Sequence, residues 1–86
     1  MKNPYSVIVK RSAEKELDRL PNQIHERITR KLLTLEENPR SPGVQKLHGE
    51  DRYRIRIGDF RVLYVINDDA RTVEIVAVGH RRDVYR

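Results

Sequence analysis

The sequence predicts a small α+β domain, in which an N-terminal strand and a helical hairpin pack on a mainly antiparallel four-stranded sheet in the order β-α-α-β-β-β. Two changes of pattern predict this fold. Apolar residues recur at helical spacing in the first half of the chain, whereas after Gly49 apolar and polar residues alternate with a period of two. The chain has 86 residues, the length of one small domain, so residues 1–86 are expected to form a single domain.

The first half supplies a strand and two helices. The β-branched run Tyr5–Val9 predicts a strand, and Ser12 is expected to cap the helix that follows. Leu20 and Pro21 end that helix and begin another, because proline is favoured in the first turn of a helix. The second helix runs to a stop at Asn38-Pro39. Its apolar positions are Ile24, Ile28, Leu32 and Leu35, and the basic residues expected on its solvent side are Arg27, Arg30 and Lys31.

A β-hairpin begins the second half. Residues 52–57 alternate without exception, Gly58-Asp59 turns the chain, and residues 60–66 run back. Glycine in the first position of a two-residue loop is typical of a type II′ turn, which fixes the register. The face expected to meet the helices then carries three cross-strand pairs, Ile57 with Phe60, Ile55 with Val62, and Tyr53 with Tyr64. The opposite face carries Arg52, Arg54, Arg56 and Arg61, together with Leu63 and Val65.

The same register makes Arg56 and Arg61 direct cross-strand neighbours. Like charges in that position destabilise a sheet by up to about 1 kcal/mol, so stability alone would select another pair. The arginines either splay apart on a solvated polar face or form a site where an anion docks, and we favour the anion site.

The last predicted strand, residues 72–78, is apolar on both faces, as expected for a strand inside the sheet. Its register with the preceding strand is uncertain by one residue, so the direction of His80 stays open. The C-terminal residues Arg81, Arg82 and Tyr85 are expected at the same rim.

The composition is basic. Eighteen Lys and Arg against 13 Asp and Glu give a net charge of +5, and from Arg52 onward every basic residue is an arginine. Guanidinium groups bind phosphate through a planar fork, so this half suits a phosphate-bearing partner or an acidic protein groove, with an ordinary basic surface as the alternative. The sequence has no cysteine, no apolar run of the roughly 20 residues that a membrane span needs, and no secretory h-region at its start. We therefore expect a soluble, cytoplasmic protein.

Few kinds of catalysis are compatible with these residues. The three histidines are far apart in sequence, so no metal site is expected, and no cofactor motif is present. The remaining groups suit metal-independent cleavage of RNA, in which guanidiniums offset developing charge, a histidine or tyrosine moves a proton, and an aromatic ring stacks on a base. His80 and Tyr85 also have the alternative of being ordinary surface or packing residues. The candidates are Arg54, Arg56, Arg61, His80, Arg81, Arg82 and Tyr85.

Three segments of the chain resemble one family. Leu47–Tyr64, Val78–Tyr85 and the early Lys10–Pro21 are similar to the RelE/ParE toxin superfamily, specifically its RelE branch, and the similarity covers essentially the whole chain. The resemblance implies a toxin of a type II toxin–antitoxin system that cleaves mRNA in the ribosomal A site without a metal. The 2′-hydroxyl attacks the adjacent phosphate and leaves a 2′,3′-cyclic phosphate and a free 5′-hydroxyl.

The resemblance also implies roles for single residues. Arg61 matches the family's central phosphate-binding arginine, Arg81 a second transition-state arginine, and Tyr85 a tyrosine that stacks on the substrate base. Lysines stand at positions 54 and 56 in the best-known members, and the arginines found here cannot give up a proton as a general base. We therefore expect His80 to accept the 2′-hydroxyl proton, unless the arginines act through electrostatics alone. The residues expected to bind RNA are Arg52, Arg54, Arg56 and Arg82.

The resemblance implies three partners: a cognate antitoxin, RelB-like or other, with an acidic segment for the basic face, as well as mRNA and the ribosome, at its 16S rRNA and A site. The free toxin is expected to be a monomer and the complex a heterodimer or heterotetramer. Two alternatives stay open, a ParE-like inhibitor of DNA gyrase without nuclease activity and a member that binds nucleic acid without cleaving it. Arg61, Arg81, Tyr85 and His80 favour the nuclease, because a gyrase inhibitor does not require them.

Overall fold

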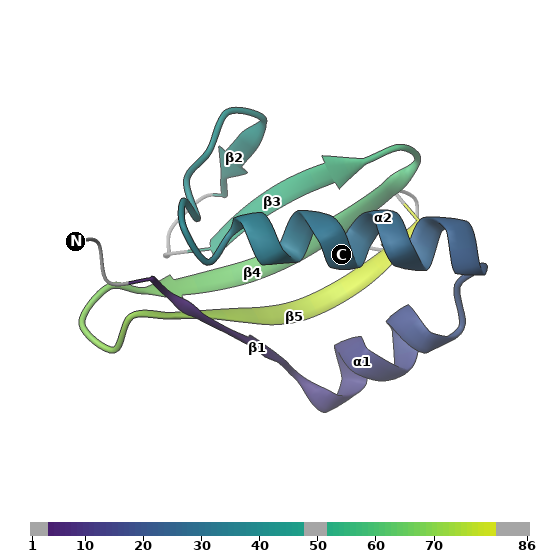
Figure 1. Ribbon diagram of the computed structural model, residues 1–86, viewed down its shortest axis with the longest axis horizontal. Coiled ribbons are helices and arrows are strands. Elements are labelled where there is room, and N and C mark those ends of the chain that lie inside the picture. Colours follow the sequence, from purple (N-terminus) through teal and green to yellow (C-terminus); the bar gives the residue numbers. More distant parts are fainter. Residues whose placement is uncertain (1–3, 48–51, 81–86) are drawn as a thin grey trace.

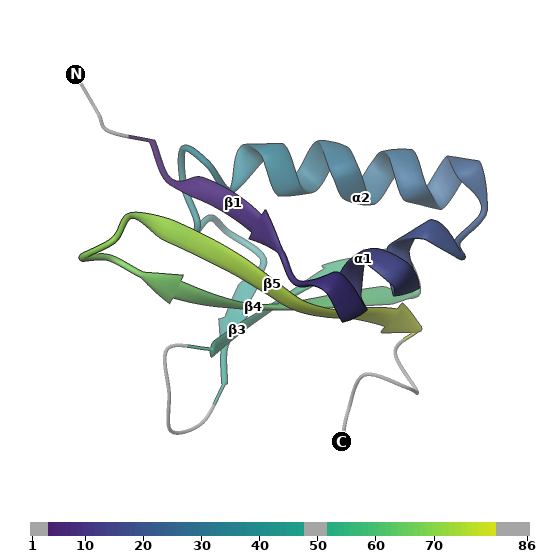
Figure 2. The ribbon, with the colours of Figure 1, turned by 90° about the horizontal axis from the view of Figure 1, so that it is seen from below.

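The computed structural model describes residues 4–47 and 52–80. Its strands form one sheet in the order β1-β5-β4-β3-β2, and both helices lie on the same side of that sheet (Figures 1 and 2). All strand pairings are antiparallel except that of β1 with β5, which is parallel. The elements are β1 (Ser6–Val9), α1 (Arg11–Asp18), α2 (Asn22–Thr34), β2 (Val44–Lys46), β3 (Arg52–Ile57), β4 (Phe60–Asn67) and β5 (Thr72–His80). The expected α+β class is therefore confirmed.

Within the residues that the structure describes, the sheet has five strands where the sequence predicted four. The additional strand is β2, which spans three residues and pairs with β3 through Val44–Ile55, Gln45–Arg54 and Lys46–Tyr53. A strand of three residues is too short for an alternating pattern to stand out, so it is defined by its partner rather than by its own sequence.

The register predicted for the β3–β4 hairpin is confirmed. Tyr53 pairs with Tyr64, Ile55 with Val62, Arg56 with Arg61, and Ile57 with Phe60. Gly58 has φ +59°, the positive φ that the first loop position of a type II′ turn requires and that glycine adopts without a Cβ penalty.

The core lies between the helices and the sheet. The inward positions of α2, Ile28 and Leu32, are buried, Leu35 just beyond the helix is buried as well, and Ile24 is partly buried. The strands β3, β4 and β5 contribute their inward residues, which alternate along β3 and β4, whereas Ile75 and Val78 of β5 are three residues apart. These are Tyr53, Ile55, Ile57, Val62, Tyr64, Ile66, Val73, Ile75 and Val78. The described residues contain no helix that is long and apolar enough to cross a bilayer.

The connection from β1 to α1 explains why Ser12 is not a cap. The Lys10 backbone N–H donates to the Ile75 carbonyl of β5, while the Lys10 carbonyl already accepts the first helical hydrogen bond from Glu14, at 2.8 Å. The helix therefore begins at Arg11 directly after the strand, and its N-cap, Lys10, makes no side-chain hydrogen bond. Ser12 lies inside the first turn, so the capping prediction was wrong.

A cluster of polar side chains around the β4–β5 turn connects segments that are far apart in the sequence. Asp68, in the β4–β5 turn, accepts two hydrogen bonds from the guanidinium of Arg40, at 2.9 and 3.1 Å, and one from the Tyr5 hydroxyl at 2.6 Å. Arg40 also donates through Nε to the Tyr53 hydroxyl at 3.0 Å. The hydrogen bonds from Arg40 and Tyr5 lower the pKa of Asp68 to about 2. The cluster joins the chain before β1, the α2–β2 loop and the β4–β5 turn.

Candidate nucleic-acid interface

The sheet face that neither helix covers, here called the open face, carries the predicted arginines. Cross-strand pairing arranges its residues in rows that run from β3 through β4 to β5. One row consists of Arg56, Arg61 and Gly79, the next of Arg54, Leu63 and Ala77, and a third of Arg52, Val65 and Glu74. Four guanidinium groups therefore come from two adjacent strands on one face, as the sequence predicted.

Arg61 is only 8% exposed, so it does not fit the alternative interpretation of a solvated polar face. Its direct neighbours across the strands are Arg56 on one side and Gly79, which presents no side chain, on the other. A buried guanidinium is held in place more firmly than one on a surface side chain, and removing it from water strengthens its interaction with an anion. Burial therefore makes Arg61 the best-organised cation of the open face.

The other three arginines are more accessible. Arg52 and Arg56 are exposed, and Arg54 is half-buried and donates to the side-chain oxygen of Gln45 on β2. Gln45 was not among the residues singled out from the sequence, because its strand was not predicted. Its hydrogen bond fixes the direction of Arg54 on the open face.

His80 lies on the opposite face from Arg61. It pairs with Phe60, and the two rings meet edge to face with their centroids 5.7 Å apart. Residues that pair directly across antiparallel strands point to the same face, so His80 points, as Phe60 does, to the side that the helices cover. The structure therefore places the expected base and the expected phosphate ligand on different faces of the sheet. Arg81, Arg82 and Tyr85 lie outside the described residues.

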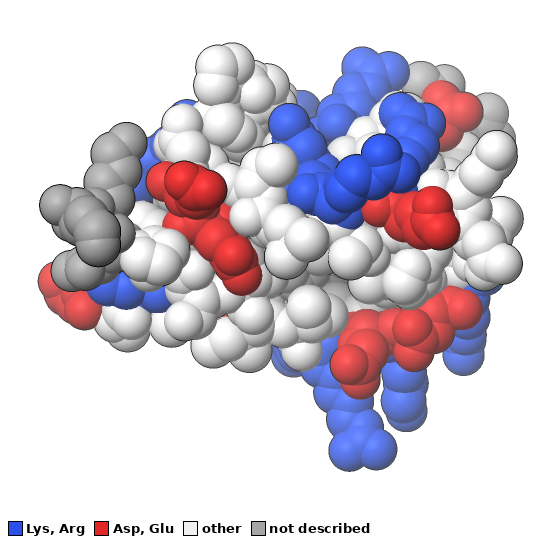
Figure 3. All heavy atoms as spheres, viewed as in Figure 1, with Lys and Arg blue, Asp and Glu red and all other residues white. Residues whose placement is uncertain are grey.

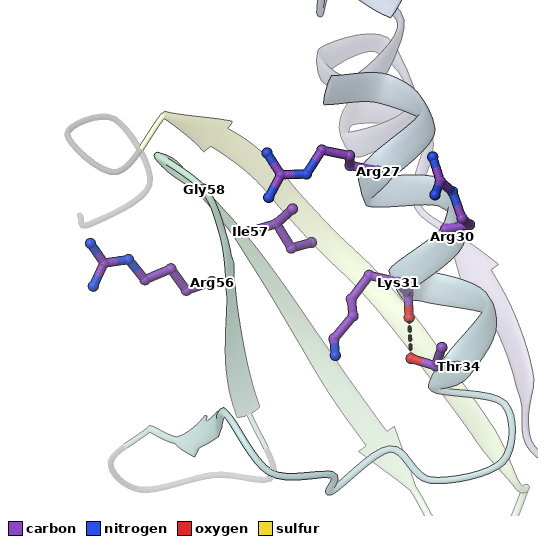
Figure 4. Close-up of a pocket in the computed structure, with 7 residues that line it drawn as sticks. All are labelled: Arg27, Arg30, Lys31, Thr34, Arg56, Ile57 and Gly58. Atoms are coloured by element: carbon purple, nitrogen blue, oxygen red, sulfur yellow. Dashed lines mark hydrogen bonds between the residues drawn. The ribbon is translucent and has the colours of Figure 1, made fainter. Parts of the chain in front are cut away.

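A second group of cations lies on the helix-covered side. Arg27, Arg30 and Lys31 of α2 line a cavity of about 430 Å³ that reaches Arg56 of β3 and Gly58 of the β3–β4 turn (Figure 4). Their spacing of three and four residues places them along one side of the helix, a signal that the sequence contained. The sequence did not show that the end of β3 and the β3–β4 turn lie opposite them. Among the described residues, no group of three or more His, Cys, Asp or Glu side chains is arranged to hold a metal ion.

Comparison with known proteins agrees with this architecture. The family model described as the ParE toxin of the type II toxin–antitoxin system parDE matches residues 7–85. The chain belongs to the RelE/ParE toxin superfamily. Within this superfamily it is similar to a RelE-like toxin protein of Escherichia coli, with 35% identity over 94% of this chain and 90% of that protein. It is also similar to the toxin RelE of Mycobacterium tuberculosis, with 33% identity over 98% of this chain and 89% of that protein.

Solved structures of RelE proteins share the fold of this superfamily member. The archaeal RelE–RelB complex from Pyrococcus horikoshii contains a chain that matches with a TM-score of 0.84 and 30% identity, over 94% of this chain and 99% of that one. The isolated RelE toxin of Escherichia coli matches with a TM-score of 0.80 and 30% identity, over 94% of this chain and 90% of that one. These relatives place the chain on the RelE branch of the superfamily, so it is a toxin of a type II toxin–antitoxin system.

Proposed function

We propose that this toxin is a metal-independent endoribonuclease that cleaves mRNA in the ribosomal A site and so inhibits translation. The observation that carries the proposal is the open face, where the buried Arg61 stands beside Arg56 and one row from Arg54. Attack of a ribose 2′-hydroxyl on the adjacent phosphate builds negative charge on the phosphorane oxygens. Preorganised guanidiniums stabilise that charge more than they stabilise the ground state, and this difference lowers the barrier.

The products follow from this chemistry. The 2′-oxygen forms a bond to phosphorus, the bond from phosphorus to the 5′-oxygen breaks, and the strand ends in a 2′,3′-cyclic phosphate and a 5′-hydroxyl. In this proposal Arg61 binds the phosphate, Arg81 stabilises the transition state, and Tyr85 stacks on the base. Arg52, Arg54, Arg56 and Arg82 hold the surrounding RNA backbone.

The identity of the proton acceptor is the open step of the mechanism. For His80 to accept the 2′-hydroxyl proton, its ring must leave Phe60 and pass around the end of β5. If it does, the single-turnover rate of the wild type will level off at high pH, and His80→Ala will lose that plateau. An activity of His80→Ala with the wild-type pH profile would exclude this role and leave electrostatic catalysis by the arginines.

The proposed partner that restrains the toxin is a RelB-like antitoxin. Complexes of related RelE proteins with RelB from Pyrococcus horikoshii and Methanococcus jannaschii support this proposal. An acidic segment would neutralise the open face. Ribosomes and mRNA, the proposed targets, place the toxin's action in the cytoplasm.

Primer extension on a defined message in a reconstituted translation reaction tests the nuclease. Arg61→Ala should abolish cutting inside codons, whereas Arg11→Ala, which removes an exposed arginine from α1, should leave it unchanged. A message with a single 2′-deoxynucleotide before the scissile phosphate should resist cutting at that site, because the attacking hydroxyl is missing. Cutting at the deoxy site would contradict the mechanism.

The match to the ParE model favours one other function, inhibition of DNA gyrase without RNA cleavage. The same purified protein should therefore be tested for inhibition of DNA supercoiling by gyrase. An intact message together with inhibited supercoiling would replace the nuclease by this function.

A further inference from the structure

The cavity between α2 and the β3–β4 turn contains cations of α2 that the proposed cleavage mechanism does not use. Figure 3 shows Lys and Arg side chains gathered over α2, on the side of the molecule that the helices cover. Four of the seven residues that line the cavity are cations, and none is an acid. The lining consists of Arg27, Arg30, Lys31, Thr34, Arg56, Ile57 and Gly58.

These cations are not engaged in stabilising the fold. Within the part of the chain that the structure describes, no hydrogen bond or ion pair involves the side chain of Arg27, Lys31 or Arg56. Arg30 reaches Glu26 at 3.9 Å, and both side chains are 74% exposed, so that contact is a weak surface pair. Like charges gathered without partners repel one another. Their placement is therefore explained better by an external anion than by folding.

The β3–β4 turn positions one of these cations. Nη1 of Arg27 lies 3.4 Å from the point that a Cβ on Gly58 would occupy, so the guanidinium rests against the turn. Figure 4 shows Arg27 and Lys31 both extending from α2 toward β3. A cation that is already held in its binding position loses less conformational entropy when an anion arrives.

The chemistry of the cavity favours a phosphate over an acidic protein segment. A guanidinium fork and an ammonium group together match the oxygens of a phosphodiester. A protein helix or strand would need apolar anchors, but Ile57 is the only large apolar side chain in this lining. The exposed Leu33 belongs to a separate hollow beside Thr29 and His25.

Arg56 connects the cavity to the open face. It lines the cavity and is also the cross-strand neighbour of Arg61, and in Figure 4 its side chain extends away from α2. A nucleic-acid backbone held at Arg61 can therefore continue around the edge of β3 toward Arg27 and Lys31. Beyond the pairing of Val44 with Ile55, β2 no longer covers this edge, so the path is not blocked by that strand.

We propose that the cavity between α2 and the β3–β4 turn is a second phosphate-binding site, which holds an RNA backbone phosphate at a distance from the cleaved bond. Arg27 and Lys31 are its principal ligands. This inference rests on the proposed action on RNA, and it assigns to α2 a contribution to affinity.

The test compares two double variants that remove the same charge. Arg27→Gln/Lys31→Gln changes the cavity, and Arg11→Gln/Lys15→Gln changes an equally spaced pair on α1. Glutamine is a good helix former, so both double variants should keep their helices, and thermal melts establish that both fold. The probes are a 2′-O-methyl RNA oligonucleotide, which cannot be cleaved by 2′-hydroxyl attack, and 70S ribosomes without mRNA.

We expect the cavity variant to bind RNA at least about tenfold more weakly than the control variant, with the slope of log affinity against log salt reduced by about 0.7 for the one single-strand phosphate contact. Weaker binding of the oligonucleotide would identify the message as the source of the phosphate, and weaker binding of ribosomes alone would identify ribosomal RNA. Equal affinities and salt slopes of the two variants for both probes would overturn the proposal, as would an effect confined to binding of the antitoxin. Because these assays measure binding, they give a result even if the wild type proves not to cut mRNA.

Discussion

Replacement of Tyr64 by phenylalanine tests how the core holds the α2–β2 loop. Tyr64 is completely buried, and its hydroxyl donates to the Pro39 carbonyl at 2.8 Å. Phenylalanine keeps the ring, which stacks on Tyr53 with centroids 5.9 Å apart, and removes only the hydrogen bond. Loss of one such bond costs about 1 kcal/mol. For a domain of this size that corresponds to a fall in Tm of about 4–8 °C.

The same substitution changes the stability at alkaline pH. Burial, with a smaller contribution from Tyr53, raises the pKa of Tyr64 well above the ordinary tyrosine value of 10.0. Between these two pKa values the folded protein holds a proton that the unfolded chain releases, so the stability of the wild type falls as pH rises above about 10. The loss approaches about 1.4 kcal/mol per pH unit for this one group. Tyr64→Phe removes this loss.

The two effects predict that the stability curves cross. The wild type should be more stable by about 1 kcal/mol near neutral pH, and the variant should be more stable above a pH between about 10 and 11. Urea unfolding of both proteins is followed by circular dichroism at several pH values. The difference between their free energies of unfolding isolates Tyr64, because the other titrating groups are common to both proteins. Curves that stay parallel up to pH 11 would show that the hydroxyl is not buried as described.

Two further substitutions test contacts at the ends of the sheet. In the polar cluster, Asp68→Asn should make the free energy of unfolding less dependent on pH in acid. Because its pKa is lowered, the Asp68 carboxylate contributes fully to stability above about pH 4, and this contribution is lost as pH falls toward about 2. Urea unfolding of both proteins at acid pH measures the difference. At the other end, Glu16 accepts a hydrogen bond from the Val78 backbone N–H at 3.0 Å, beyond the β5 residues that β1 covers. Glu16→Ala should therefore unfold at lower denaturant concentration than Glu16→Gln, with a difference of about 1 kcal/mol, because glutamine keeps an acceptor.

The hairpin was predictable because its own sequence fixes its geometry. Gly58-Asp59 allows only a short loop, and a two-residue loop leaves no freedom of register, so the pairing of Arg56 with Arg61 followed directly. The direction of His80 was not predictable. β4 and β5 change register between Leu63 and Tyr64, since Leu63 pairs with Ala77 but Tyr64 pairs with Ile75. This bulge adds one residue to β5 and reverses which face the following residues meet.

The basic side of α2 could be read from the sequence only as a solvated helix face. What makes it a candidate site is the β3–β4 turn, which lies about thirty residues further along the chain and meets α2 only after folding. The burial of Arg61 was equally inaccessible, because an alternating pattern predicts which face a residue occupies and does not predict how far solvent reaches on that face.

The arginines of the open face limit what this face can contribute to cleavage. A lysine at position 54 or 56 could both hold a phosphate and exchange a proton, whereas arginine keeps its charge at every relevant pH. The acid in the described rows of the open face is Glu74, which lies in the row of Val65. Val65 is four residues along β4 from Arg61, so Glu74 is about 13 Å from the row of Arg61. That separation exceeds any hydrogen bond to a phosphate held at Arg61. The described part of the open face is thus equipped to bind and stabilise charge. In the proposed cleavage the proton is therefore accepted by His80 after it changes face, by a residue outside the described ranges, by the bound RNA or by solvent.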